Sequence, residues 1–336
     1  MSVRESPLAF PAEEVHALVA HDDGGALVVV DNDPDIYSPK YCRGPSTPDK
    51  ALCAKLDVWR FGDDGRTRWR TTVTDKTNVD KDGAHFIWWY QRTARLAWTG
   101  AEYLVYYRAA DSSPRPGVPR EIDIHTGDAF AFVGADGERG RERRTSGCSH
   151  SWAVRLAFNG RFGSACHGDA YPNAFHVIVA ERGRRLGAST LHANLDPTKR
   201  ALGGLVPTAE GFWLLHMAQA ARMELHLAFF DNAGKVTRDT TVAEAVDLET
   251  AYPFRAYLAE YGADGMLAGW MSAGKLQLAV LSRATGALLE GPVGVDARID
   301  KWVELVPYPN GDVGWAWNPG GTARLDLARV AACGGG

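Results

Sequence analysis

The chain has 336 residues, a net charge of −4, 36 glycines and 11 tryptophans. Its one short basic run, Arg139–Arg144, falls in an expected turn, which argues against a nucleic-acid partner. No apolar run approaches the roughly 20 residues of a membrane span. Abundant glycine and aromatic residues are typical of many short strands joined by tight turns.

Apolar runs separated by turn residues recur from one end of the chain to the other. Each pair of runs predicts a β-hairpin, and no stretch has the length and pattern of a long helix. In chain order, the expected hairpins are Glu14–Val30, Leu56–Val73, Ala94–Tyr107, Ala129–Arg143, Ala153–Cys166, Phe175–Leu191, Leu202–Met217, Met223–Val242, Phe254–Met271, Leu276–Gly291 and Trp302–Trp317, followed by a lone strand at Ala323–Val330.

Hairpins of two kinds alternate, and the more apolar kind begins near residues 14, 94, 152, 202, 254 and 303. A repeat of about 50 residues with four strands resembles the β-propeller superfamily. We therefore predict an all-β, single-domain propeller over residues 1–333, with six four-stranded blades; five or seven blades remain alternatives. Val3–Phe10 is expected to supply the closing strand. No WD, kelch or NHL signature is present, so the resemblance implies no particular activity.

Five cysteines suggest two disulfides and one spare thiol. Cys42 and Cys53 bracket a loop rich in Pro and Ser, so we expect an insertion over residues 38–55 of blade one. Cys148 and Cys166 bracket the hairpin that turns at Asn159-Gly160, a strong hairpin signal. Such pairs favour a secreted or periplasmic protein that has lost its signal segment, with five reduced thiols and a cytoplasmic location as the alternative. Residues 334–336 are expected to be a disordered tail.

The ends of the central hairpin carry the chemistry that we expect at the mouth of the channel. His150, His167 and His216 could meet across adjacent blades and bind a divalent metal such as Zn, Cu, Mn or Ca. Asp169 could add an oxygen ligand or orient an imidazole. The alternative is that each histidine is a hydrogen-bonded residue of the blade wall.

Two further groups of residues are candidates for the same mouth. An acid–base site would use His167 or His150 with Tyr171 and either Arg155 or Arg255, an arrangement suited to a lyase on acidic sugars. Tyr171 could instead close a turn, and Arg155 could form a buried ion pair. Trp88, Trp89, Trp315 and Trp317 could stack on a sugar ring, or they could pack between blades.

These patterns lead to one functional hypothesis and two alternatives. We expect an exported bacterial enzyme, a lyase or hydrolase, that acts on a carbohydrate or anionic small molecule with His as general base or metal ligand. The alternatives are a non-catalytic propeller that binds a ligand or metal, and a platform for protein interaction. A monomer with a small-molecule or glycan ligand, and without nucleic acid, is expected in each case.

Overall fold

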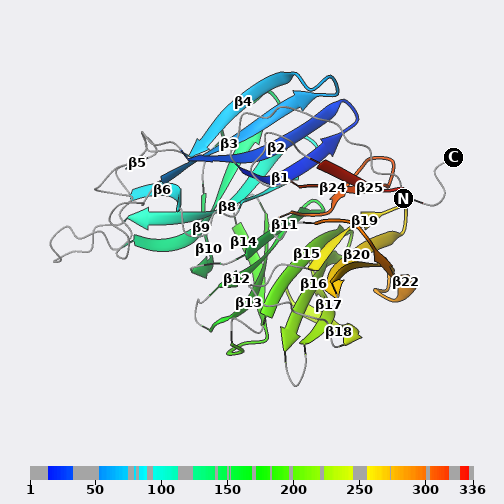
Figure 1. Ribbon diagram of the computed structural model, residues 1–336. Helices are drawn as coiled ribbons and strands as arrows, with labels where there is room; N and C mark the ends of the chain where they lie inside the picture. Colours follow the sequence, from blue (N-terminus) through cyan, green and yellow to red (C-terminus); the bar gives the residue numbers. More distant parts are fainter. Residues whose placement is uncertain are drawn as a thin grey trace.

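The computed structural model describes 17 segments of the chain, which together contain all of its assigned strands. They are residues 14–32, 53–74, 79–80, 83–88, 94–112, 124–140, 143–149, 151, 153–168, 172–181, 184–196, 200–219, 223–244, 256–272, 274–299, 303–317 and 326–332. No helix lies within these segments, and none therefore offers a helical membrane span. The strands form antiparallel sheets, as the alternating apolar pattern predicts (Figure 1).

Blades one and two share one continuous set of hydrogen-bonded strands. Blade one contains β1 (Glu14–His21), β2 (Gly24–Asn32), β3 (Cys53–Gly62) and β4 (Thr67–Thr74). Blade two contains β7 (Ala94–Trp98), β8 (Glu102–Ser112), β9 (Ile124–Gly134) and β10 (Arg143–Ser149). Between them, β6 (Gly83–Trp88) pairs with both β3 and β8, and the short β5 (Val79–Asp80) pairs with β6.

Blades three, four and five are separate four-stranded sheets. Blade three contains β11 (Ala153–Phe158), β12 (Phe162–Gly168), β13 (Ala174–Glu181) and β14 (Arg184–Leu191). Blade four contains β15 (Arg200–Thr208), β16 (Gly211–Gln219), β17 (Met223–Asp231) and β18 (Val236–Glu244). Blade five contains β19 (Ala256–Tyr261), β20 (Gly265–Ser272), β21 (Lys275–Ser282) and β22 (Leu288–Val295).

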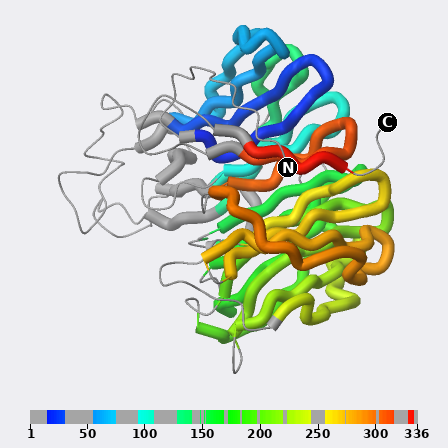
Figure 2. The backbone as a smooth tube through the Cα atoms, turned by 45° about the vertical axis from the view of Figure 1, so that its right-hand side comes forward, coloured from blue at the N-terminus to red at the C-terminus, as the bar shows by residue number. Residues whose placement is uncertain are grey.

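Blade six contains β23 (Val306–Pro307), β24 (Val313–Trp317) and β25 (Asp326–Val330). The first strands of the blades contact one another in the order β1, β7, β11, β15, β19 and β23, and β23 contacts β1 again. The six-bladed ring is therefore closed, and Figure 2 shows red β25 between blue blade one and the yellow and orange strands of blade five. The expected closing strand Val3–Phe10, the 38–55 insertion and the 334–336 tail lie outside the described residues, apart from the start of β3.

The hydrophobic core lies between neighbouring blades. Val28 and Val58 of blade one pack with Val105 and Tyr107 of blade two, and similar clusters join each later pair of blades. Both faces of a blade are covered by its neighbours, so residues on both faces of the middle strands are apolar. β16 is an example, because every residue from Gly211 to Ala218 is buried.

The predicted central hairpin is confirmed. β11 and β12 pair from Ala153 opposite His167 to Phe158 opposite Phe162. Gly160 has a φ of 100°, the left-handed conformation that an Asn-Gly turn needs. The Asn159 side-chain amide donates to the carbonyl oxygen of Thr208, so the turn also ties blade three to blade four.

Candidate metal centre and the axial cluster

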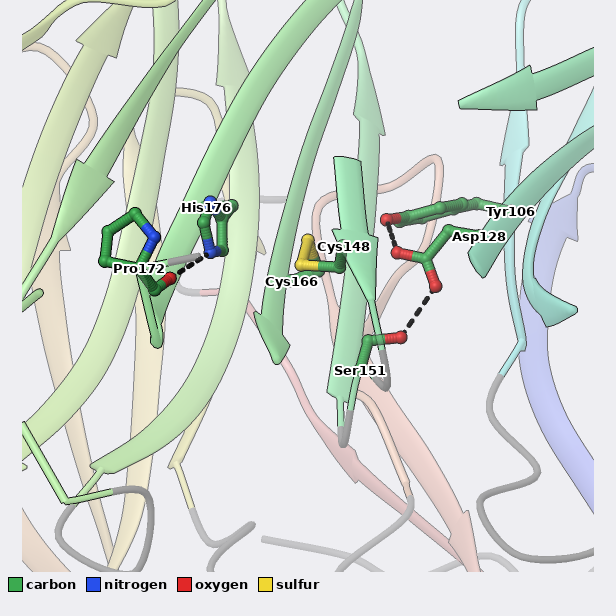
Figure 3. Close-up of a disulfide and its surroundings, with 7 residues drawn as sticks. All are labelled: Tyr106, Asp128, Cys148, Ser151, Cys166, Pro172 and His176. Carbon is green, nitrogen blue, oxygen red and sulfur yellow. Dashed lines mark hydrogen bonds between the residues drawn. A yellow bond between two sulfur atoms is a disulfide. The ribbon is translucent and has the colours of Figure 1, made fainter. Parts of the chain in front are cut away.

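Figure 3 shows the end of the central hairpin and its link to blade two. Cys148 of β10 and Cys166 of β12 form the predicted disulfide, and both residues are buried. Beside it, Asp128 accepts hydrogen bonds from the hydroxyls of Tyr106 and Ser151, at 2.5 and 2.6 Å. Covalent and polar contacts thus fix blade two against blade three. The side chains of Cys42 and Cys53 lie outside the described residues.

His167 lies on β12 with no accessible surface, and its ring packs edge-on against Phe175. Burial, with Arg200 and His176 nearby, lowers the pKa of His167 to about 3. An imidazole with such a pKa is neutral at pH 7 and is a weak proton acceptor. Its environment resembles the wall position that the sequence offered as the alternative to a metal ligand.

His216 belongs to a cluster whose other members the sequence analysis did not single out. It lies with His192, His226 and Asp239, and each offers one ligand atom within 4.8 Å of all the others. His167 is not part of this group. The ring of Phe175 packs against both His167 and His216, with centroids 5.1 and 5.3 Å away.

Strand register explains how three of these four residues meet. His216 of β16 and His226 of β17 are direct register partners, so both side chains point to the same face of blade four. Their rings stack with an angle of 7° and centroids 5.1 Å apart. Asp239 of β18 reaches the same face, and its carboxylate oxygen Oδ1 lies 3.4 Å from both His216 Nε2 and His226 Nδ1.

His192 comes from blade three, immediately after β14. Its φ is 51°, an uncommon value for a residue with a side chain. Arg200, which is fully buried, donates to the His192 carbonyl oxygen and to the side chain of Asn173. The His192 Nε2 lies 3.7 Å from a carboxylate oxygen of Asp239, so the cluster joins blade three to blade four.

The electrostatics of the cluster leave its imidazoles able to act as ligands. Burial, reinforced by nearby His216, lowers the pKa of His192 to about 4, and burial also lowers that of His216. The hydrogen bond with Asp239 raises the pKa of His226. Burial opposes ionisation of Asp239, but hydrogen bonds from His216 and His226 outweigh it and lower the pKa of its carboxyl. At neutral pH His192 and His216 therefore present neutral imidazole nitrogens and Asp239 presents a carboxylate, the forms that bind metals, whereas His226 holds its proton more strongly and would release it to a cation.

The donor set fits a transition metal. Three imidazole nitrogens and one carboxylate oxygen suit Zn²⁺ and its first-row neighbours, whereas Ca²⁺ takes oxygen ligands. Glu224 extends the arrangement, because its carboxylate oxygen lies 3.2 Å from His226 Nε2. Carboxylates at this position orient metal-binding histidines in many proteins. His226 would then use Nδ1 as its ligand atom, on the side that faces Asp239.

A cavity of about 300 Å³ adjoins the cluster. His192 and His226 form part of its wall, together with the polar side chains of Asn194, Gln219 and Glu224. The exposed fractions of the His192, His226 and His216 side chains are 25%, 15% and 0%. A small molecule in this cavity can therefore contact His192 and His226. His216 has no exposed side-chain surface and lies deeper in the cluster.

A second polar cluster lies where the inner strands meet. Arg155 of β11 proves to be a buried ion-pair residue on the ring axis, because Glu304 of the opposite blade lies 3.3 Å from its Nε. Arg95 of β7 pairs with the same carboxylate oxygen at 2.5 Å. Both guanidinium groups also donate to carbonyl oxygens of neighbouring inner strands, those of His16 and Leu202. Burial and the nearby Arg95 lower the pKa of Arg155 to about 9, although Glu304 opposes this shift.

The remaining predicted site residues divide into two groups. Trp315 is buried in the core between blades five and six, and its Nε1 donates to the Arg298 carbonyl oxygen, which favours the packing alternative. The structure does not describe the side chains of the others, although Trp88 ends β6 and Trp317 ends β24. These predictions remain open; they concern His150, Asp169, Tyr171, Arg255, Trp88, Trp89 and Trp317.

Comparison with known proteins supports the fold. No protein-family model and no curated protein sequence matches the chain. It is similar to Trypanosoma rangeli sialidase in complex with the inhibitor DANA, with a TM-score of 0.53 and 8% identity. The match covers 96% of this chain and 56% of the sialidase chain, so this chain spans just over half of that protein. AofleA from Arthrobotrys oligospora matches with a TM-score of 0.50 and 11% identity, over 99% of this chain and 93% of that one. The protein is a six-bladed β-propeller.

Proposed function

We propose that the protein is a metal-binding β-propeller in which His192, His216, His226 and Asp239 hold a Zn²⁺-like cation between blades three and four. The observation that carries this proposal is the convergence of four ligand atoms within 4.8 Å of one another. His216, His226 and Asp239 lie on adjacent strands of blade four. His192, the fourth residue, has a left-handed backbone conformation. Proteins maintain such strained residues mainly at functional sites.

We further propose that the cavity beside the cation is a substrate site. Asn194, Gln219 and Glu224 supply hydrogen-bond donors and acceptors for a hydroxylated or anionic molecule of about the size of a monosaccharide. A bound cation would polarise a ligand oxygen and support hydrolysis or elimination. Similarity to a sialidase supports a carbohydrate ligand by analogy of fold alone. The inter-blade disulfide supports an exported location.

A non-catalytic role is the second candidate, and the number of ligands favours it. Four protein donors complete a tetrahedral zinc shell, which is typical of structural sites, whereas catalytic sites keep one position for water or substrate. In this case the cation would hold blade three against blade four, as the disulfide holds blade two against blade three.

Both candidate functions require a bound cation, and metal analysis of protein purified without a His tag tests for it. We expect one equivalent of Zn²⁺ or Co²⁺ per chain, and loss of binding in His216→Ala. His176→Ala is the matched control, since His176 lies on β13 outside the cluster and should leave binding unchanged. Absence of bound metal, together with no binding by titration, would refute the proposal.

The Co²⁺ form separates the two candidates. A fifth ligand at the metal changes the visible spectrum of tetrahedral Co²⁺, so thiocyanate or a sugar acid can be titrated into the loaded protein. We expect a spectral change, and metal-dependent turnover of aryl glycosides or uronic-acid oligosaccharides, if the cavity is an active site. An unchanged spectrum without turnover would assign the cation a structural role.

A further inference from the structure

A cavity of about 260 Å³ lies on the ring axis, apart from the His192–Asp239 cluster. All six blades line it with residues at the ends of their inner strands, such as Phe158, which precedes the Asn159-Gly160 turn. The cavity therefore belongs to the end of the ring at which this hairpin turns. Each blade contributes one leucine to its wall. These are Leu18, Leu96, Leu156, Leu205, Leu258 and Leu305.

Two carboxylates, those of Glu260 and Glu304, are the charged groups of this wall. Their side chains are 35% and 27% exposed, so a molecule in the cavity can reach them. Arg95 and Arg155 contact Glu304 through Oε1, and Arg283 contacts Glu260 through Oε2. Within the described part of the chain, Glu304 Oε2 and Glu260 Oε1 accept no hydrogen bond. The cavity thus offers a ligand two acceptor oxygens in an apolar wall.

The charges around Glu304 favour a neutral ligand. Arg95 and Arg155 lie behind this carboxylate, are only 3% exposed and do not line the cavity. Together the three groups carry a charge of +1, which opposes the approach of a cation. An anion would instead face the carboxylates of the wall. A neutral group that donates a hydrogen bond avoids both costs, because it needs only a free acceptor oxygen.

We propose that this axial cavity binds a small neutral molecule with an apolar body and one hydroxyl group, such as a phenol. Glu304 precedes Leu305 in the chain and lies at the level of the leucines, whereas Glu260 follows Leu258 by two residues and lies nearer the turn. The apolar body would therefore pack among the leucines while the hydroxyl donates to Glu304 Oε2. A cavity of about 150 Å³ is enough for benzene, so this one has room for a hydroxylated ring.

Phenol is the probe, and anisole, benzoate and benzylamine are its counterparts without a donor, with a negative charge and with a positive charge. Phenol is neutral at pH 7, because its pKa is close to the value of about 10 for tyrosine. We expect calorimetry or ligand-observed NMR to detect phenol binding to the full chain. Anisole should bind at least about tenfold more weakly, because it leaves the carboxylate oxygen without a donor. Both charged compounds should also bind more weakly, because each must lose the hydration of its charge. No phenol binding at about 10 mM, or equal or tighter binding of any of the other three, would overturn the proposal.

Two variants locate the site. Leu18→Trp fills the cavity at the level of the leucines, and Ala20→Trp narrows it nearer the turn. Both side chains are partly exposed in the wild-type protein, so each position has space for a larger one. Each variant should weaken phenol binding at least about tenfold, because the indole occupies the place of the ligand ring. Leu288→Trp is the control, because Leu288 is 51% exposed on the outer strand β22. Unchanged phenol affinity in either folded cavity variant would place binding elsewhere and overturn the proposal.

Discussion

The His192–Asp239 cluster and the Arg95–Arg155–Glu304 cluster both bring buried polar side chains together from different blades. They differ in what their atoms can bind. Imidazole nitrogens and a carboxylate offer lone pairs, so the first cluster suits a cation. Guanidinium groups offer only N–H donors, so the second suits carboxylate and carbonyl oxygens. The same ring thus gathers two polar clusters of opposite charge preference, one between blades and one on the axis.

Removing the axial carboxylate should have the largest effect. Glu304→Gln leaves two buried guanidinium groups without their anion, and we expect a loss of about 3 kcal/mol in the free energy of unfolding. Urea unfolding measures this change. Asp64→Asn is the control, since Asp64 and Arg66 form an exposed pair at 3.5 Å and should contribute almost nothing. A Glu304→Gln protein as stable as wild type would mean that the axial charges do not hold the ring together.

Metal binding should stabilise the protein by slightly less than the loss expected for Glu304→Gln. Zn²⁺ at a hundred times its dissociation constant is expected to raise the free energy of unfolding by about 2.7 kcal/mol. Asp239→Asn should abolish this increase, because it removes the anionic ligand. Thermal or urea unfolding with and without Zn²⁺ gives the difference. An equal increase in Asp239→Asn would place the cation at another site.

Glu224 should act through His226 and not through the cation itself. Glu224→Gln is expected to weaken Zn²⁺ binding by about 10- to 100-fold, the usual effect of losing a carboxylate that orients a ligand histidine. Competition with a chelator measures the affinity, and the apparent pKa of His226 by NMR should fall at the same time. Glu210→Gln, an exposed carboxylate on a turn, is the control. Weaker binding without a change at His226 would contradict the positioning role.

His167 should control acid stability without affecting either cluster directly. Its folded pKa of about 3 lies below the ordinary value of 6.5, so the unfolded chain binds a proton that the folded chain refuses. Stability should therefore fall as pH drops from about 6.5 towards 3, by about 1.4 kcal/mol per pH unit. His167→Leu should flatten this part of the profile in urea unfolding. An unaltered slope would mean that His167 is not buried in its neutral form.

The ring and part of the candidate cation site could be predicted from the sequence, because both depend on local pattern. Alternating apolar residues with Asn-Gly and Gly-rich turns predict the hairpins, and the interval of about 50 residues predicts the blades. His216 and His226 lie at equal distances from the turn between β16 and β17, and this symmetry could have identified them as register partners.

The place of His192 and the pairing of Glu304 with Arg155 depend on how the blades pack, and a local sequence pattern does not encode this packing. His192 reaches the cluster from blade three only because β14 lies against blade four and Arg200 holds its backbone. Glu304 meets Arg155 across the axis, although the two are 149 residues apart, from positions 155 and 304. Alternation left Arg155 between a channel lining and a buried ion pair, and the structure shows the ion pair with Glu304.

Zinc titration of wild-type protein beside His192→Ala tests the central claim most directly, because only that histidine brings a ligand from blade three. The account predicts one tight Zn²⁺ equivalent per chain for wild type and at least about a hundredfold weaker binding for His192→Ala. A wild-type chain that takes up no Zn²⁺, or a variant that binds it equally well, would contradict a cation shared between blades three and four.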